Sequence, residues 1–198
     1  MNDDLLRRIA SVLAAHPTAS MAEVARSLGI GRTTLYRRFS DREAMTREVA
    51  AQAGADFVRA VVAADPGRGR GFDALARIAR ALFDLPDVLT LLFADTPLLT
   101  DPVLEAAYGR VIADSGEKAN PHAIPAEMLE TDNDLIAAVV LRGRGDGSIR
   151  DVPVAWAAMF VYFTLGSAHL YATGTGASRS AALDLALEAF DRTLGVAG

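Results

Sequence analysis

The amino-acid sequence predicts an all-α fold of about nine helices, with a three-helix N-terminal domain that contains a helix-turn-helix and a C-terminal helical bundle. Apolar residues recur at helical spacing along most of the chain, and no segment shows the alternation typical of a strand. Glycine and proline gather in clusters between runs rich in alanine and leucine, as expected for helices joined by short loops. With 51% hydrophobic and 23% charged residues, the 198-residue chain has the composition of a folded globular protein.

Local signals delimit the first two helices. The first predicted helix runs from about Asp3 to His16 and ends before Pro17, because the residue before a proline disfavours helical geometry. The segment Ser20–Glu23 has the pattern of a capping box, in which the serine and the glutamate each bond a backbone N–H of the other. The second helix therefore begins there, and it ends at Gly29, a residue suited to the left-handed conformation that follows a helix.

The third predicted helix extends from about Arg32 to Phe39. A second capping-box pattern, Ser40–Glu43, then opens a long fourth helix that reaches about Ala64. We interpret the segment Asp65–Gly71 as a turn or linker, because a phosphate-binding loop needs a preceding strand. Further helices are expected near 72–85, 86–94, 101–115, 126–142, 153–173 and 178–194, with a loop at 143–147.

The third helix has an apolar side and a polar side. Leu35 and Phe39, four residues apart, are expected to anchor it to the apolar face of the second helix. The residues that then point outwards or lie on the flanks are Thr33, Thr34, Tyr36, Arg37 and Arg38. An arginine can bond guanine and a threonine methyl can meet thymine in the major groove, while tyrosine and further arginines hold phosphates. On its own, this face is equally consistent with an amphipathic helix whose polar side meets water.

Charge is distributed unevenly along the chain. Residues 1–50 carry eight arginines against six acidic residues, a net charge of +2. The whole chain has a net charge of −5, so the remainder carries −7. A mildly basic end on an acidic chain fits a protein that docks one end on phosphate.

Residues 20–39 carry the most specific motif of the chain. The helix-turn-helix of the TetR family of bacterial transcriptional repressors closely resembles the run SMAEVARSLGIGRTTLYRRF. The matching positions are Ser20, Glu23, Val24, Ala25, Gly29, Ile30, Thr34, Leu35, Tyr36 and Phe39. The following Ser40–Met45 resembles the start of the family's fourth helix. The sequence departs from the family pattern in two places. The segment His16–Ala19 replaces an aromatic–glycine turn, and Gly31 stands where serine is common, which predicts a weaker cap on the third helix.

This resemblance implies a transcriptional repressor with a helix-turn-helix DNA-binding domain at 1–50 and a C-terminal effector-binding and dimerisation domain at 51–198. It implies a homodimer on double-stranded, palindromic operator DNA, because a two-fold dimer reads two half-sites. A small-molecule effector in the C-terminal domain would release the DNA. The residues expected at the DNA are Ser20, Arg32, Thr33, Thr34, Tyr36, Arg37, Arg38 and Arg42.

The segment Val152–Ser178 contains no charged residue and is long enough to cross a bilayer. Its second half contains polar residues such as Ser167 and His169, and no second segment of this kind exists. We therefore interpret it as a helix buried in a subunit interface, and we expect no membrane partner. The resemblance implies that the last two helices pair with those of a second subunit. The interface residues expected are Phe163, Gly166, Leu170, Leu183, Leu187 and Phe190.

Apolar and aromatic residues of the C-terminal domain fit either an effector pocket or a hydrophobic core. The candidates for the pocket are Phe83, Leu92, Phe93, Tyr108, Met128, Trp156 and Phe160. Such a lining predicts an apolar or aromatic effector.

Several functions are excluded by what the sequence lacks. Without cysteine there is no disulfide or thiolate metal site, and the three histidines have no acidic residues at ligand spacing, so neither a metal nor a cofactor is expected. No catalytic motif is present, and we expect no enzyme. Asp3 and Asp4 precede the first apolar residues, unlike a secretory leader, so we expect a cytoplasmic protein. The alternative is a helical protein-interaction module without DNA binding, which the acidic net charge favours and the outward face of the third helix opposes.

Overall fold

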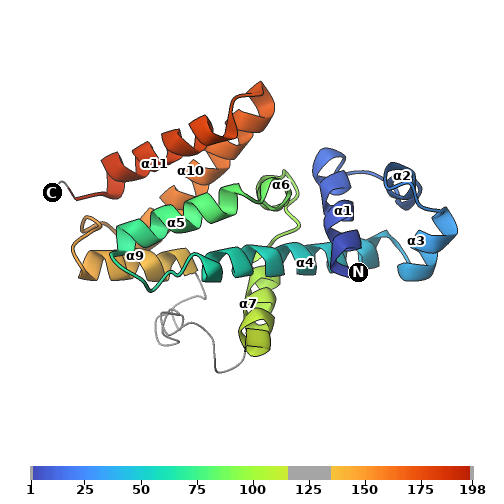
Figure 1. The fold of residues 1–198 in the computed structure, drawn as a ribbon, viewed down its shortest axis with the longest axis horizontal. Helices are drawn as coiled ribbons and strands as arrows, with labels where there is room; N and C mark the ends of the chain where they lie inside the picture. Colours follow the sequence, from blue (N-terminus) through green and yellow to red (C-terminus); the bar gives the residue numbers. More distant parts are fainter. Residues whose placement is uncertain (1, 116–134, 197–198) are drawn as a thin grey trace. The chain divides into compact units, whose positions relative to one another are not determined.

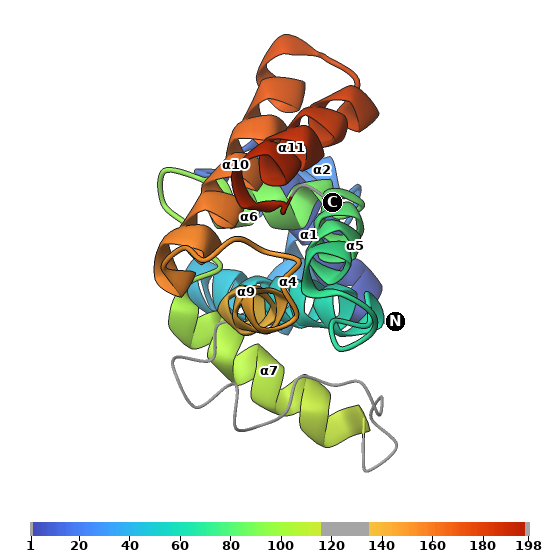
Figure 2. The same cartoon turned by 90° about the vertical axis from the view of Figure 1, so that its left-hand side faces the viewer.

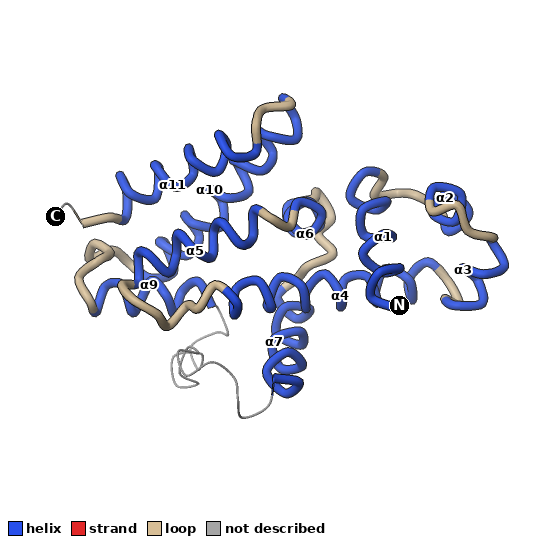
Figure 3. The backbone as a smooth tube through the Cα atoms, viewed as in Figure 1, coloured by secondary structure: helices blue, strands red, loops and turns tan. Residues whose placement is uncertain are grey.

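The computed structural model describes residues 2–115 and 135–196, and these residues form ten helices. Within these two ranges there is no strand, only an isolated β-bridge between Ile149 and Gly195 (Figure 3). The helices are α1 (Asn2–Ala15), α2 (Met21–Ser27), α3 (Arg32–Arg38), α4 (Arg42–Ala63), α5 (Gly71–Phe83), α6 (Pro86–Phe93), α7 (Asp101–Ser115), α9 (Leu135–Gly145), α10 (Val154–Thr175) and α11 (Arg179–Leu194). The all-α prediction is confirmed for these residues.

The chain forms two compact units. The N-terminal unit comprises Met1–Val58 and Asp87–Asp114, and the C-terminal unit comprises Arg59–Pro86 and Ser115–Gly198. In the N-terminal unit, α1, α2 and α3 lie together at the N-terminal end of α4 (Figure 1).

Three predicted features of the helix-turn-helix are confirmed. Ser20 and Glu23 form the capping box of α2, with both reciprocal hydrogen bonds present. Gly29, just past the end of α2, has a φ of +68°, which a residue with a Cβ rarely adopts. Gly31 is the N-cap of α3 and offers no side-chain hydrogen bond, so the expected weaker cap is present. These local choices give two short helices with a sharp turn between them.

The predicted capping box at Ser40–Glu43 is wrong. The Ala44 N–H donates instead to Asp41 Oδ1 at 2.7 Å, so Asp41 caps α4. Ser40 Oγ donates to the other carboxylate oxygen of Asp41 at 2.9 Å. These two bonds hold the pKa of Asp41 below its ordinary value, and the bond from the Ala44 backbone lowers it more. A carboxylate also suits the positive end of the helix dipole better than a hydroxyl does.

In the C-terminal unit, α5 packs against α9 and α11, and α10 packs against α9 and α11 (Figure 2). Two glycines meet between α5 and α9: a Cβ built on Gly71 would lie 2.3 Å from Gly143 Cα. Gly143 lies inside α9, which continues to Gly145, so the loop predicted to begin at residue 143 is wrong at its start. Ile149 folds back over Gly143, and a Cβ there would lie 2.5 Å from Ile149 Cδ1. This tertiary contact keeps a glycine in a helix despite its low intrinsic propensity.

The segment between α4 and α5 is a turn held by two arginines of the same unit. Arg77 donates to the carbonyl oxygens of Ala64, Asp65 and Arg68 at 2.9, 2.7 and 2.8 Å. Arg142 donates to the carbonyl oxygens of Pro66 and Gly69. The predicted turn is therefore confirmed, and its carbonyl groups have defined partners.

The remaining predicted helices agree with the structure to within a few residues, except at 126–142. The structure describes only the part of that helix from Leu135 onwards, and residues 126–134 lie outside the described residues. Among the described helices, α10 is long and apolar enough to cross a membrane by length and composition. One side of α10 is packed inside the unit, with Ala157, Leu165 and Ala172 buried.

Candidate nucleic-acid interface

The outward side of α3 is polar and exposed. Leu35 and Phe39 are 0% and 1% exposed, and α3 packs against α2, whose Val24 and Ala25 are also buried. Tyr36, in contrast, is 51% exposed. The other exposed side chains of this helix are those of Arg32, Thr33, Thr34 and Arg37. None of these five donates or accepts a side-chain hydrogen bond within the described residues, so their polar groups face solvent.

The side chain of Arg38, at the end of α3, has its partners within the protein. Its guanidinium forms two hydrogen bonds with the carboxylate of Glu48 on α4, Nη1 to Oε1 at 2.9 Å and Nη2 to Oε2. The guanidinium also lies 4.6 Å from the centroid of the Phe39 ring. The bond with Glu48 raises the pKa of Arg38 above its already high ordinary value. This arrangement fixes the end of α3 to the body of α4.

Arg42 and Ser20 also have partners within the N-terminal unit. Arg42 donates from Nε to the carbonyl oxygen of Ala19 at 3.1 Å and from Nη2 to that of Pro17 at 2.6 Å. Ser20 Oγ donates to Glu23 Oε2 at 2.7 Å and accepts from the Glu23 N–H at 3.3 Å. The backbone N–H of Ser20 also donates to Glu23, and this bond lowers the pKa of Glu23 most. Of the eight residues expected at the DNA, five on α3 therefore have no side-chain hydrogen bond within the described residues, and three form hydrogen bonds that stabilise the N-terminal unit.

Two features of this surface were not predicted from the sequence. Arg26, in the last turn of α2, is exposed and adds a positive charge. Its place three residues after Glu23, on the polar side of α2, is a signal that identifies it. Arg8 of α1 donates to the carbonyl oxygen of Leu28 at 2.9 Å and so satisfies a backbone group at the end of α2. No local pattern predicts that bond, because it joins two helices.

The residues proposed for an effector pocket lie in both units. In the N-terminal unit, Leu92, Phe93 and Tyr108 are half-buried, and burial raises the pKa of Tyr108. In the C-terminal unit, the Trp156 and Phe160 rings stack at 5.6 Å between centroids.

Phe83, the other pocket candidate of the C-terminal unit, is buried beneath the guanidinium of Arg179. Met128 lies outside the described residues. Two cavities of the N-terminal unit, of about 400 and 480 Å³, are lined by other residues.

The residues expected in a subunit interface differ in exposure. Phe163 and Leu170 of α10 are 67% and 55% exposed, whereas Gly166 is buried. Phe190 of α11 is 1% exposed and lies edge-on to Phe160, with 6.1 Å between ring centroids, so it belongs to the core of its own chain. The side chains of Leu183 and Leu187 are half-buried. Among the residues described, no group of three or more His, Asp or Glu side chains is placed to hold a metal ion.

Comparison with known proteins supports the interpretation of the N-terminal helices as a helix-turn-helix. Residues 5–49 match the family model of bacterial regulatory proteins of the tetR family. The HTH-type transcriptional repressor LfrR of Mycolicibacterium smegmatis is 32% identical over 97 residues, which cover 49% of this chain and 51% of the relative. The chain thus matches about half the length of this curated relative.

Solved structures share the fold over nearly the whole chain. The TetR-like regulator LfrR from Mycobacterium smegmatis, in complex with proflavine, superposes with a TM-score of 0.65 and 24% identity, covering 98% of this chain and 94% of that one. The regulator FadR from Bacillus subtilis, in complex with stearoyl-CoA, gives a TM-score of 0.61 at 11% identity, covering 93% and 94%. These relatives are named as regulators and not as enzymes. The N-terminal helices are thus similar to those of the tetR family of bacterial regulatory proteins, and the chain shares the fold of TetR-like regulators.

Proposed function

We propose that the protein is a cytoplasmic transcriptional repressor that binds a palindromic DNA operator as a homodimer and is released by a small effector. In this proposal residues 1–50 bind DNA, and residues 51–198 bind the effector and form the dimer. The observation that carries it is the exposed side of α3, where Thr33, Tyr36 and Arg37 have no partner within the described residues. An unpaired guanidinium and hydroxyl groups on a short, firmly packed helix suit the major groove.

We propose different roles for the last two arginines of α3. Arg37 faces solvent and is the residue proposed to read a base, because a free guanidinium can bond guanine with two parallel hydrogen bonds. Arg38 is paired with Glu48, so we propose that it positions α3. Its attraction to the DNA phosphates would be reduced by the charge of Glu48. Tyr36 and Thr33 would contact phosphates or thymine methyl groups.

The experiment is fluorescence-anisotropy titration of the purified protein with the DNA fragment upstream of its own gene, at several salt concentrations. Arg37→Ala is expected to weaken binding by about 1–3 kcal/mol and to reduce the preference over an unrelated fragment. Tyr36→Phe is expected to weaken binding to both fragments by the same factor. Arg80→Ala, which removes an exposed arginine from α5, is the matched control and leaves both affinities unchanged. Affinity that is indifferent to Arg37 and to salt contradicts the proposal and favours the interaction module.

Dimerisation is proposed to use an exposed apolar stripe on α10. Met159, Phe163 and Leu170 follow one another at helical spacing and are 57%, 67% and 55% exposed. Large apolar side chains exposed in a contiguous row are typical of a surface that a partner covers. A second copy is the partner that the family resemblance implies, since a two-fold axis would pair the stripe with itself.

Sedimentation equilibrium tests this part of the proposal. Phe163→Glu is expected to produce a monomer and to weaken operator binding, because the half-sites would then be bound independently. Leu141→Glu places the same charge on α9, at a residue that is 45% exposed, and leaves the dimer intact. A wild-type protein that sediments as a monomer at micromolar concentration rules out this interface.

The effector is proposed to be an apolar or aromatic molecule. The stacked pair Trp156 and Phe160 supplies an aromatic surface in the C-terminal unit, and the structures of LfrR with proflavine and of FadR with stearoyl-CoA support small-molecule binding by this fold. Proflavine serves as the probe, and its binding is expected to lower the affinity for the operator fragment. Binding of proflavine that leaves operator affinity unchanged contradicts its role as an effector.

A further inference from the structure

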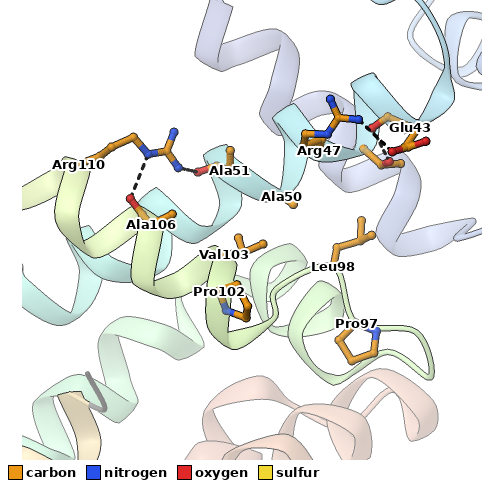
Figure 4. Close-up of a pocket in the computed structure, with 11 residues that line it drawn as sticks. Glu43, Arg47, Ala50, Ala51, Pro97, Leu98, Pro102, Val103, Ala106 and Arg110 are labelled. Atoms are coloured by element: carbon orange, nitrogen blue, oxygen red, sulfur yellow. Dashed lines mark hydrogen bonds and ion pairs between the residues drawn. The ribbon is translucent and has the colours of Figure 1, made fainter. Parts of the chain in front are cut away.

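The cavity of about 400 Å³ in the N-terminal unit is lined by none of the residues proposed above for DNA or effector binding (Figure 4). It is bounded by the first turns of α4, by α7 and by the segment between α6 and α7. Its volume falls within the range of about 300–1,000 Å³ typical of small-molecule sites. The apolar part of its lining consists of Ala50, Ala51, Pro97, Leu98, Pro102, Val103 and Ala106.

Two arginines lie at the edge of this cavity, and Figure 4 shows them along its upper margin, above Leu98, Pro102 and Val103. Arg47 pairs with Glu43 at 3.0 Å. Arg110 donates to the carbonyl oxygens of Ala106 and Ala51 at 3.2 and 3.3 Å, and it has no carboxylate partner within the described part of the chain.

The charges at the margin therefore sum to one positive charge, carried by Arg110. A guanidinium bound only to carbonyl groups keeps its full charge, and its remaining N–H groups can bond both oxygens of a carboxylate. The side chains of Leu98, Pro102 and Val103 below it offer no acceptor or donor to a second charged group. The charge pattern fits a molecule with one negative head and an apolar body.

We propose that this cavity binds a small amphipathic monocarboxylate, with the carboxylate on Arg110 and the apolar chain against Leu98, Pro102 and Val103. Its lining includes no exposed residue of α3 and none of the aromatic residues considered for the effector. It does not rest on DNA binding, so its failure leaves the proposed repressor function untouched, and loss of operator binding leaves this site untouched.

The test is isothermal titration of the full chain with octanoate, with octan-1-ol and octylammonium as probes of equal chain length. Octanoate is expected to bind most tightly. In NMR titrations, octanoate should change the backbone amide chemical shifts of the protein most at Ala50, Ala51 and Ala106. Arg110→Ala weakens octanoate binding about five- to tenfold, a loss typical of a partly exposed charged hydrogen bond. Arg110→Lys keeps the charge but loses the planar fork, so it retains part of the affinity.

Two further variants separate loss of the site from loss of the fold. Ala106→Phe fills the cavity from an exposed position and is expected to abolish octanoate binding while the circular dichroism melt is preserved. Arg80→Ala removes an exposed arginine from the other unit and leaves binding unchanged. Octanoate affinity unaltered by both Arg110→Ala and Ala106→Phe, or equal affinity for all three probes, would overturn the proposal.

Discussion

The contact between Gly71 and Gly143 allows a quantitative test of how α5 and α9 pack. Replacing Gly71 with alanine places a Cβ 2.3 Å from Gly143 Cα, 2.5 Å from its backbone nitrogen and 3.1 Å from the carbonyl oxygen of Val139. Ordinary contact begins at 3.4 Å, so the two helices must separate by about 1 Å. All three obstacles are backbone atoms, which cannot rotate away as a side chain can.

Overpacking of a core costs about 1–3 kcal/mol, and we expect Gly71→Ala to lie at the upper end, near about 3 kcal/mol. For a chain of this size, that corresponds to a decrease of roughly 6–12 °C in the melting temperature. Thermal and urea denaturation followed by circular dichroism at 222 nm measure both quantities.

Gly109→Ala is the matched control. Gly109 lies within α7, and a Cβ there meets no atom within 4 Å. The same substitution is expected to stabilise the protein by about 0.5–1 kcal/mol, because alanine loses less backbone entropy in a helix. The two variants thus differ in sign. A melting temperature of Gly71→Ala within about 2 °C of the wild type would refute the close approach of the helices.

Three further predictions concern Asp146, Leu35 and Arg77. Burial would raise the pKa of Asp146, but hydrogen bonds from Ser148 and from the backbone N–H of Gly71 outweigh it and hold that pKa below 3.8. The stabilisation from these bonds is therefore present above the pKa of Asp146 in the unfolded chain. It is lost as the pH falls through the lower pKa of Asp146 in the folded protein. Asp146→Ala should therefore cost about 1 kcal/mol at pH 7, and urea titrations should give equal stabilities for variant and wild type below that folded value; a constant difference at all pH values contradicts the linkage. Leu35→Ala should cost about 2–5 kcal/mol in urea titrations and Leu35→Met less than about 1.5 kcal/mol, and an equal loss would mean that the volume beneath α3 is not filled by this side chain. Arg77→Ala removes the donor to three carbonyl groups and should lower stability by about 1.5–3 kcal/mol, with Arg77→Lys recovering only part of it in thermal melts; full recovery would show that charge alone suffices.

The sequence predicts the helix-turn-helix well because its signals are local. Ser20, Glu23 and Gly29 act within one or two helical turns, and the spacing of Leu35 and Phe39 defines the buried side of α3 without knowledge of any distant residue. The exposed side of the helix follows from the same periodicity.

Features decided between helices escape such reasoning. Arg38 shares the polar side of α3 with Arg37, and only the position of Glu48 on α4 distinguishes an anchored arginine from a free one. Gly143 has the local pattern of a helix end, yet contacts with Gly71 and Ile149 keep it within α9. Sequence spacing cannot reveal these contacts, because they depend on how separate helices pack.

The turn between α4 and α5 has a practical consequence for dividing the chain into fragments. Arg68 and Arg70 stand among glycines, so the segment resembles an easy site for trypsin. Cleavage requires the segment to open locally, whereas here its carbonyl groups are bound by Arg77 and Arg142. The native turn is thus expected to resist digestion. A fragment that begins at residue 69 would lose part of the backbone that these two arginines bind, so a C-terminal piece should instead include the whole of α4.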